Sequence, residues 1–342
     1  MPFRPSLTPA VADIRRAVRD ALVRSGEADP APLVLVALSG GPDSLALASA
    51  VAFEGPRAGL RTGAVIVDHR LQDGSDAVAE RARQQAETLG LGVVRVVRVT
   101  VPSDSGAGPE AAARAARYDV LSSVARELGA DAVLLGHTLD DQAETVLLGL
   151  ARGSGGGSLQ GMAPAAGLYR RPLLGIRRAT TVQACADEGL EPWADPHNDD
   201  PAYTRVRVRR DVLPVLEAEL GPGVAEALAR TAEQLREDEE AFATMIDEVA
   251  EELAEFVDGG IAVAVGALAA NPAALRQRII RFVVQSEFGV SLSRAHTLEI
   301  ARLVTDWHGQ GPVDVPGIEV ARAGGRIEFR ARRSEEEHDG HR

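Results

Sequence analysis

The chain has 342 residues, of which 45% are hydrophobic, and a formal net charge of −13. This length allows a full core and predicts two domains. The absence of a signal-peptide pattern and of a run of about 18 apolar residues predicts a cytoplasmic protein without a membrane span, and a single cysteine, Cys185, excludes a disulfide framework or a CxxC metal or sulfur site.

Negative charge is concentrated in one segment. Residues 216–260 hold fourteen acidic residues and two arginines, whereas residues 151–215 hold nine arginines and seven acidic residues. The sequence contains no lysine, which excludes a covalent lysine mechanism. Arginine binds phosphate in a bidentate manner and stacks on bases, so the net charge does not exclude a nucleic-acid partner.

Strand and helix patterns alternate through the first half of the chain. Apolar runs predict strands at 33–38, 64–68, 92–101 and 132–136, and helical patterns fall near 8–25, 44–53, 76–89, 110–128 and 138–151. This alternation predicts an α/β fold with a doubly wound, mostly parallel sheet. In such folds the ligand binds at the carboxyl ends of the strands.

A glycine-rich turn follows the first predicted strand. It consists of Ser39, Gly40, Gly41, Pro42, Asp43 and Ser44. Its glycines let the backbone approach an anion, which the N–H groups and dipole of the next helix then bind. The lysine of a GxxxxGK[ST] loop is missing, so γ-phosphate transfer is not expected. Asp43 at a phosphate site requires a cation such as Mg²⁺. The alternative is an ordinary strand–turn–helix corner.

Polar residues also follow two other predicted strands. Asp68 and His69 end the second strand, and His137 ends the fourth. The helix after His137 places three acids on the same face, namely Asp140, Asp141 and Glu144. Together they predict a metal or acid–base site, whereas the alternative is acids that complement a helix dipole.

Arginines recur in three further motifs. Arg114 and Arg117 share a helix face, where they form either surface ion pairs or contacts with phosphate. A second patch, RRPLLGIRR (170–178), is expected on a loop and a helix start. The segment DPHNDDPAYTRVRVRRDVLP (195–214) combines Tyr203 with arginines, as suits single-stranded RNA, and the alternative is a solvated basic helix. Trp193 is expected in the core or at an interface.

The rest of the chain predicts a helical connector and a small domain. We expect a catalytic domain over 1–215, an acidic helical connector over 216–260, an α+β domain over 261–331 and a disordered tail over 332–342. Long acidic helices are predicted at 211–258, further helices near 272–286 and 293–305, and a β pair at 313–320 and 325–330.

The motifs together resemble those of the tRNA(Ile)-lysidine synthases, a family of N-type ATP pyrophosphatases with a PP-loop. The matching pieces are VALSGGPDSLAL (36–47), VDHRLQDGS (67–75), EAAARAARY (110–118), GHTLDDQAET (136–145), LARGSGGGSLQGM (150–162), RPLL (171–174) and the segment 195–214. The resemblance implies ATP and Mg²⁺ as cofactors, free L-lysine and tRNA(Ile) with a CAU anticodon as substrates, and a possible homodimer. The wobble cytidine would be adenylated, and lysine would then displace AMP to give lysidine.

The resemblance also implies roles for single residues. Catalysis would involve Asp43, Arg114, Arg117, Asp140 and Asp141. ATP would be held by Ser39, Gly40, Gly41, Pro42, Asp43, Ser44, Asp68, His69 and His137, and the metal by Asp43, Asp141 and Glu144. Contacts with tRNA would come from Arg152, Arg171, Asn198, Tyr203, Arg205 and Arg209. Val206 stands where the family often has Asn, and the chain has no room for the larger second C-terminal domain of longer members.

Three other functions remain as alternatives. A tRNA cytidine 2-thiolation enzyme shares the SGGxDS loop but needs cysteines for sulfur transfer or a cluster. An NAD synthetase gives no reason for the arginine-rich region 170–210. A catalytically inactive tRNA-binding protein would not need the acids of the two motifs.

Overall fold

The computed structural model describes residues 7–22, 31–70, 74–99, 109–153 and 156–332. The chain forms two compact units, Met1–Arg236 and Glu237–Arg342. The tail predicted at 332–342 lies, apart from Arg332, outside the described residues. Among those residues, no helix combines the length and the apolar character that crossing a bilayer would need.

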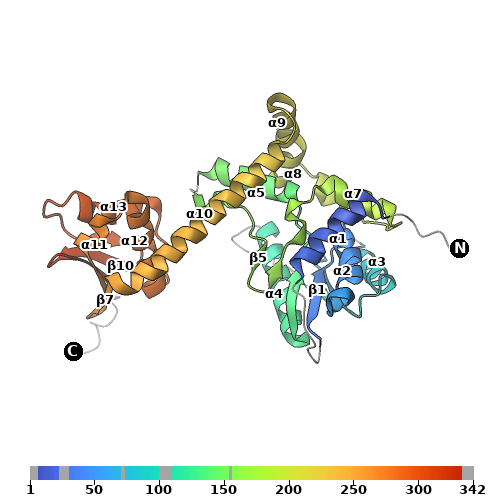
Figure 1. Cartoon of the computed structure of the whole chain (residues 1–342), viewed down its shortest axis with the longest axis horizontal. Coiled ribbons are helices and arrows are strands. Elements are labelled where there is room, and N and C mark those ends of the chain that lie inside the picture. The colour runs from blue at the N-terminus through green and yellow to red at the C-terminus, as the bar shows by residue number, and fades with distance from the viewer. Residues whose placement is uncertain (1–6, 23–30, 71–73, 100–108, 154–155, 333–342) are drawn as a thin grey trace, which may run out of the picture. The chain divides into compact units, whose positions relative to one another are not determined.

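A six-stranded sheet organises the first unit (Figure 1). Its strands, in the order β3-β2-β1-β4-β6-β5, are Val93–Arg98, Arg61–Asp68, Leu33–Ala37, Ala130–Leu134, Tyr169–Arg170 and Ala165–Ala166. All neighbours pair in parallel except the edge strand β5. The apolar run of β1 is largely buried, as expected for a central parallel strand covered on both faces.

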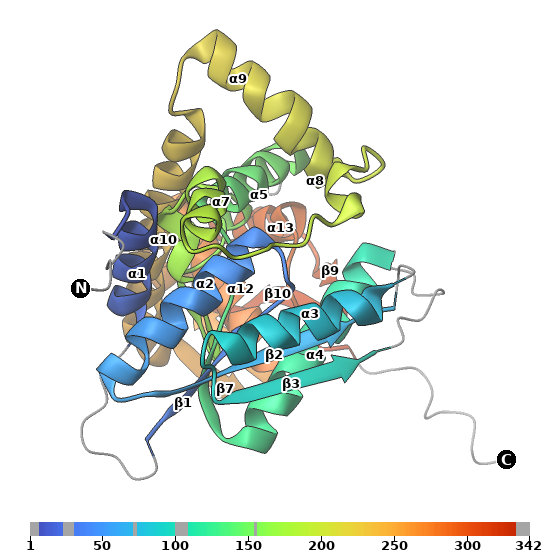
Figure 2. The ribbon, with the colours of Figure 1, turned by 90° about the vertical axis from the view of Figure 1, so that its right-hand side faces the viewer.

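Helices cover both faces of this sheet (Figure 2). On one face lie α1 (Pro9–Ala21), α2 (Pro42–Glu54), α3 (Ser75–Thr88) and α7 (Arg178–Asp187), and on the other lies α4 (Pro109–Leu128). The first unit also contains α5 (Leu139–Arg152), α6 (Gly156–Leu159), α8 (Thr204–Arg207), α9 (Leu213–Leu220) and the first part of α10 (Val224–Leu253). Val34 and Val36 of β1 pack with α1, α2, α3 and α7, whereas Leu33 and Leu35 face α4. The predicted doubly wound α/β fold is confirmed.

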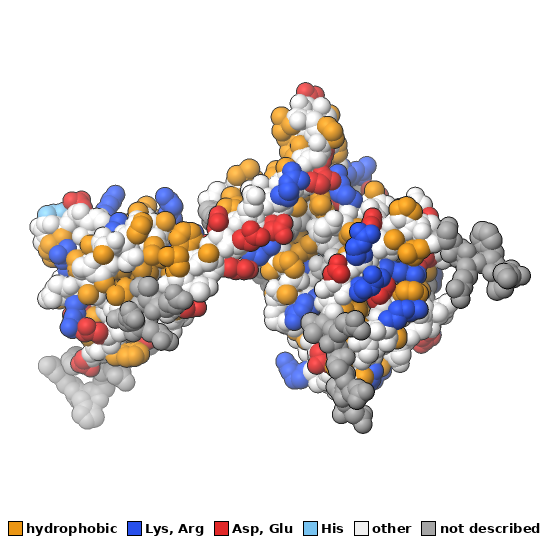
Figure 3. Space-filling model, viewed as in Figure 1, with side chains coloured by type: hydrophobic (Ala, Val, Ile, Leu, Met, Phe, Trp, Pro, Cys, Tyr) orange, Lys and Arg blue, Asp and Glu red, His pale blue; other side chains and the backbone are white. Residues whose placement is uncertain are grey.

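Residues 204–220 form one helical arm. A π-helical turn, Val208–Val212, joins α8 to α9. The arginines at 205, 207 and 209 therefore lie on a helix. On α9, Val215 and Leu220 are exposed, and Figure 3 shows hydrophobic side chains there above arginines at the base of the arm.

The second unit is an antiparallel sheet packed with helices. Its strands, in the order β7-β8-β11-β10-β9, are Ala254–Val257, Gly260–Ala264, Arg326–Ala331, Ile318–Ala323 and Val313–Val315. Its helices are α11 (Val265–Ala270), α12 (Ala273–Phe288) and α13 (Arg294–Thr305). The core includes Ile279, Ile300 and Phe329. The boundaries proposed at 215 and 260 stay predictions.

The prediction of helix throughout 211–258 is wrong at its end, where β7 pairs with β8. The acidic run that continues to Glu255 resembles the preceding helix, but a turn at Gly259, with φ +77°, reverses the chain. A Cβ on Gly260 would overlap the carbonyl oxygen of Phe329, so this strand needs a glycine to reach its partner. Pairing with a distant strand thus overrides the local helical pattern.

Candidate active site

The glycine turn adopts the strand–turn–helix shape that its sequence predicts. Gly40 has φ +85°, a conformation that disfavours other residues. Gly41 is the N-cap of α2, and its side-chain-free backbone leads directly into that helix. The hydroxyl of Ser44 donates to the carbonyl of Gly41 at 3.0 Å, and the backbone N–H of Ser39 donates to Ser44 Oγ at 3.1 Å. The turn is therefore held in shape for an anion.

The end of β4 approaches this turn closely. A Cβ on Gly136 would lie 3.0 Å from the backbone nitrogen of Ser44. Residues after Gly136 lead into α5, where Thr138 and Asp141 form a capping box. Thr138 donates its backbone N–H and its hydroxyl to Asp141 Oδ2, both at 2.8 Å. The first turn of α5 is thereby fixed beside the start of α2.

Three carboxylates meet two arginines at this point. Arg178 Nη2 lies 3.0 Å from Asp141 Oδ1, and Arg178 Nε lies 3.3 Å from Asp43 Oδ2. Arg209 donates to both oxygens of Glu144, at 2.6 and 3.1 Å. The side chain of Glu144 is 0% exposed, that of Asp141 11% and that of Asp43 19%. We call Asp43, Asp141 and Glu144 the acid cluster.

Burial and arginines set the pKa values of the acid cluster. Burial raises the pKa of Asp43 above its usual value despite the nearby Arg178, and burial likewise raises the pKa of Glu144 despite Arg209. Burial also acts upward on Asp141, but Arg178 and the hydrogen bonds from Thr138 outweigh it and hold its pKa below the usual range. Asp141 is therefore the most readily ionised of the three.

Asp140 faces a different set of partners. It accepts a hydrogen bond from the backbone N–H of Arg178 at 2.7 Å, and Arg177 Nη1 lies 3.2 Å away. Arg177 also reaches Glu217 at 3.5 Å and Glu226 at 3.2 Å. Asp140 thus joins α5 to α7, α9 and α10 and is not part of the acid cluster.

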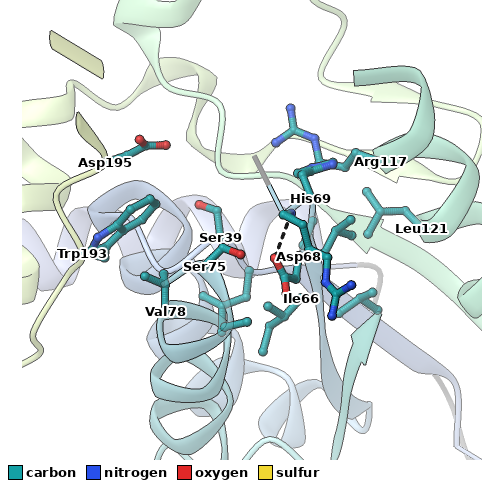
Figure 4. Close-up of a pocket in the computed structure, with 16 residues that line it drawn as sticks. Ser39, Ile66, Asp68, His69, Ser75, Val78, Arg117, Leu121, Trp193 and Asp195 are labelled. Carbon is teal, nitrogen blue, oxygen red and sulfur yellow. Dashed lines mark hydrogen bonds between the residues drawn. The ribbon is translucent and has the colours of Figure 1, made fainter. Parts of the chain in front are cut away.

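A cavity of about 220 Å³ opens at the carboxyl ends of β1 and β2. Ser39, Asp68 and His69, which the sequence analysis expects to hold ATP, line it. Val78 and Trp193 lie on one side, and Arg117 and Leu121 on the other (Figure 4). Asp68 Oδ2 is buried without a hydrogen-bond partner in the described part of the chain. The cavity therefore offers an apolar slot with unused polar groups at its rim.

Both predicted histidines are held neutral. Burial lowers the pKa of His137 to about 4, and Arg114, Arg171 and Arg117 act in the same direction. Burial, followed by Arg117, also lowers the pKa of His69. The Nδ1 atoms of both rings are buried without a partner among the described residues. Each ring can therefore offer a neutral nitrogen to a ligand.

The arginines predicted to act in the site lie in different surroundings. Arg117 lines the cavity, while Arg114 lies over the ring of Tyr118, 5.0 Å from its centroid. Arg209 is turned toward Glu144, and Arg205 Nη2 lies 3.4 Å from Thr145 Oγ1. Four further residues are predicted to contact tRNA. Arg152 is exposed in the last turn of α5, and Arg171 donates to the carbonyl of Ala163. Tyr203 is the N-cap of α8, and the side chain of Asn198 lies outside those described.

Sequence reasoning missed three residues of the site. Arg178 was assigned to a basic patch, yet it points at Asp43 and Asp141. Thr181 donates its hydroxyl to Asp43 Oδ1, and Trp193 donates its backbone N–H to the carbonyl of Gly40 at 2.9 Å. The one usable signal was charge balance, because three clustered acids require cations.

The donor set suits a magnesium ion that arrives with a nucleotide. No three His, Cys, Asp or Glu side chains form a ready metal site in the part of the chain that the structure describes. Mg²⁺ needs only one or two protein carboxylates when phosphates and waters complete its shell. Asp43 and Asp141 are hard oxygen donors beside the glycine turn. Burial raises the pKa of Asp43, so a cation bound beside it would favour its ionised form.

Two family models match the chain. One described as a PP-loop domain covers residues 13–216, and one described as a TilS substrate binding domain covers residues 264–328. A tRNA(Ile)-lysidine synthase from Leifsonia xyli subsp. xyli is 64% identical over 301 residues, which are 88% of this chain and 90% of the relative. A tRNA(Ile)-lysidine synthase from Thermobifida fusca is 51% identical over 317 residues, which are 92% and 95% of the two chains.

A solved structure shares the fold. The U34-tRNA thiolase NcsA from Methanococcus maripaludis, with its 4Fe-4S cluster, gives a TM-score of 0.55 at 21% identity, over 67% of this chain and 79% of the thiolase.

Proposed function

The chain belongs to the tRNA(Ile)-lysidine synthase family, and from this premise we propose that it joins lysine to C2 of the wobble cytidine of tRNA(Ile) with a CAU anticodon. ATP is cleaved to AMP and pyrophosphate in the reaction. The observation that carries the proposal is the acid cluster, which lies where the anion-binding turn, α5 and α7 meet.

ATP is proposed to bind across the cavity and the glycine turn. The adenosine would enter the slot between Trp193 and Arg117, with Asp68 and His69 at its rim. Ser39 lines both the slot and the turn, so the phosphates would continue onto Gly40, Gly41, Pro42 and Ser44 at the start of α2. This placement brings the α-phosphate close to Asp43, with His137 nearby at the end of β4.

Magnesium would be held by Asp43 together with the phosphates, with Asp141 as a second carboxylate. Bound there, it would neutralise charge on the phosphates. Thr181 donates to Oδ1 of Asp43, and the other oxygen, Oδ2, faces Arg178 at 3.3 Å. Glu144, which is fully buried behind Arg209, would act on the charge of the site rather than as a direct ligand.

The cytidine O2 would then attack the α-phosphate, and free lysine would displace AMP from C2. Arg114 and Arg117 lie close enough to His137 to lower its pKa, and they would contact the phosphate or the cytidine. Asp141 is the most readily ionised member of the acid cluster, so we assign it the lysine ammonium and the proton that this group must lose. Asp140 would hold α5 in position.

Binding of tRNA would involve the helical arm and the second unit. Arg152 is exposed and the side chain of Arg205 is 34% exposed, whereas Arg209 is paired with Glu144. A homodimer is part of the proposal only through family membership. The thiolation alternative is not favoured, because iron–sulfur clusters are held by several thiolates and this chain has one cysteine, which is buried.

The proposal is tested by measuring pyrophosphate release from ATP by the full chain. Release should require tRNA(Ile) with the CAU anticodon, because the cytidine is the group that is adenylated. Release that continues at the same rate without any tRNA would contradict the proposal. AMP formation in the absence of lysine would agree with the adenylation step but would contradict lysine as the group that displaces AMP.

A further inference from the structure

Arg178 occupies the position between two carboxylates of the acid cluster. Its Nη2 atom is 3.0 Å from Asp141 Oδ1 and its Nε atom is 3.3 Å from Asp43 Oδ2. Neither the turn nor α5 supplies this cation. Arg178 is the first residue of α7, so a third element neutralises the place where the other two meet.

The two contacts differ in quality. The bond to Asp141 is a charge-assisted hydrogen bond. The Nε group, in contrast, has no hydrogen-bond partner among the described residues, so the contact between Arg178 and Asp43 rests on charge proximity alone. The Arg178 side chain as a whole is 26% exposed, although the Nε atom that faces Asp43 is buried.

Hydrogen bonds from other residues keep the two carboxylates in place independently of Arg178. Thr181 donates to the other oxygen of Asp43, and Thr138 donates twice to Asp141. The backbone of Arg178 is fixed as well, since its N–H donates to Asp140 Oδ2 at 2.7 Å. Only the side chain of Arg178 is therefore free to exchange partners.

A metal ion and this guanidinium would compete for Asp43. Two positive groups a few ångströms apart repel each other strongly in a half-buried site. If Mg²⁺ arrives with ATP at Asp43, as the proposed function requires, Arg178 must yield that contact. The contact between Arg178 and Asp43 lies directly at the glycine turn, because Asp43 is part of that turn and of the first turn of α2.

We propose that Arg178 is a resident counter-ion, which holds Asp43 and Asp141 ready in the nucleotide-free enzyme, is displaced from Asp43 by Mg²⁺, and then stabilises charge on the departing pyrophosphate. This inference rests on the proposed function. It predicts that removing the arginine has two opposite effects: the affinity for Mg²⁺ rises, whereas the rate of the chemical step falls.

The test measures binding of α,β-methylene-ATP to the full chain by calorimetry over a Mg²⁺ series, next to pyrophosphate release. In Arg178→Met the Mg²⁺ concentration for half-maximal binding should fall about tenfold, which corresponds to about 1.4 kcal/mol. Pyrophosphate release should slow at the same time. A midpoint that is unchanged or higher in Arg178→Met overturns the inference, as does wild-type turnover.

Arg177→Met is the matched control, because Arg177 contacts Asp140, Glu217 and Glu226 but not Asp43, and its Mg²⁺ midpoint should stay at the wild-type value. If Arg178→Met does not fold, Arg178→Lys carries the same test, since an ammonium cannot reach both carboxylates as a planar guanidinium does. Its midpoint should also fall, and an unchanged one overturns the inference. Wild-type enzyme that binds the nucleotide without any need for Mg²⁺ would instead contradict the proposed function.

Discussion

At the residue scale, Asp43 is the carboxylate on which the account depends most. Asp43→Asn preserves the shape of the side chain and the bond from Thr181 but removes the charge that a metal–phosphate complex needs. We expect pyrophosphate release to fall by roughly 100-fold or more, in line with the loss of a main electrostatic group. The matched control is Asp76→Asn, which changes an acid in the first turn of α3. Wild-type release by Asp43→Asn would remove the Mg²⁺ assignment.

His137 makes the stability of the first unit depend on pH. Its pKa is about 4 in the folded protein and near 6.5 in the unfolded chain. Between these values the unfolded state binds more protons, so stability is lost as the pH falls from 6.5 toward 4. The loss at pH 5 should be roughly 2 kcal/mol. Urea unfolding of His137→Asn, followed by the fluorescence of Trp193 in a Trp307→Phe background, should show a flatter dependence, and identical slopes would contradict this.

The sequence predicted a shared site for Asp140, Asp141 and Glu144 but not their partners. Helical spacing placed the three acids on one face, yet Asp140 contacts Arg177 and the backbone of Arg178 instead of joining the acid cluster. Arg178 and Thr181 come from a segment more than 30 residues away, and nothing in their own neighbourhood distinguishes them from a solvated basic patch. Only the fold reveals that the acid cluster is neutralised from inside the chain.

At the element scale, the capping box of α5 couples stability to the site. Thr138→Val should remove the hydroxyl that bonds to Asp141 and destabilise the first unit by about 1 kcal/mol. Turnover should fall as well, because Asp141 loses one of the groups that orient it. Thr138→Ser keeps the hydroxyl and should retain both properties. Equal loss in the two variants would show that packing of the methyl group, and not the cap, matters.

Elements with a strong local pattern were predicted within a few residues, and those set by distant pairing were not. Buried apolar strands such as β1 and capped helices such as α5 carry their own signals. Strand β7 depends on β8, and the π-helical turn between α8 and α9 has no mark in the sequence. The edge strand β5 and its neighbour β6 have two residues each, too few for any periodicity.

At the scale of the whole molecule, the two units have separate cores. Phe242 and Ile246 of α10 pack into the core of the second unit, and Ala225 belongs to a cluster of the first. A chain ending at Arg236 should therefore keep its affinity for α,β-methylene-ATP, because every residue of the cavity is present. It should lose most tRNA turnover, since the segment that matches a substrate-binding domain is gone. Calorimetry and pyrophosphate release separate the two effects.

Two outcomes would contradict this division. Loss of nucleotide binding by the shortened chain, with its helical content intact, would place part of the ATP site in the second unit. Undiminished turnover on tRNA would show that the second unit is not needed for the substrate.

The most direct test of lysidine synthesis supplies the full chain with ATP, Mg²⁺, labelled lysine and tRNA(Ile) with the CAU anticodon. Methionine tRNAs with the same anticodon serve as controls. The account predicts ATP-dependent label in tRNA(Ile) alone, at the wobble cytidine. Label in no tRNA while pyrophosphate is still released would contradict it, since adenylation would then serve a different nucleophile.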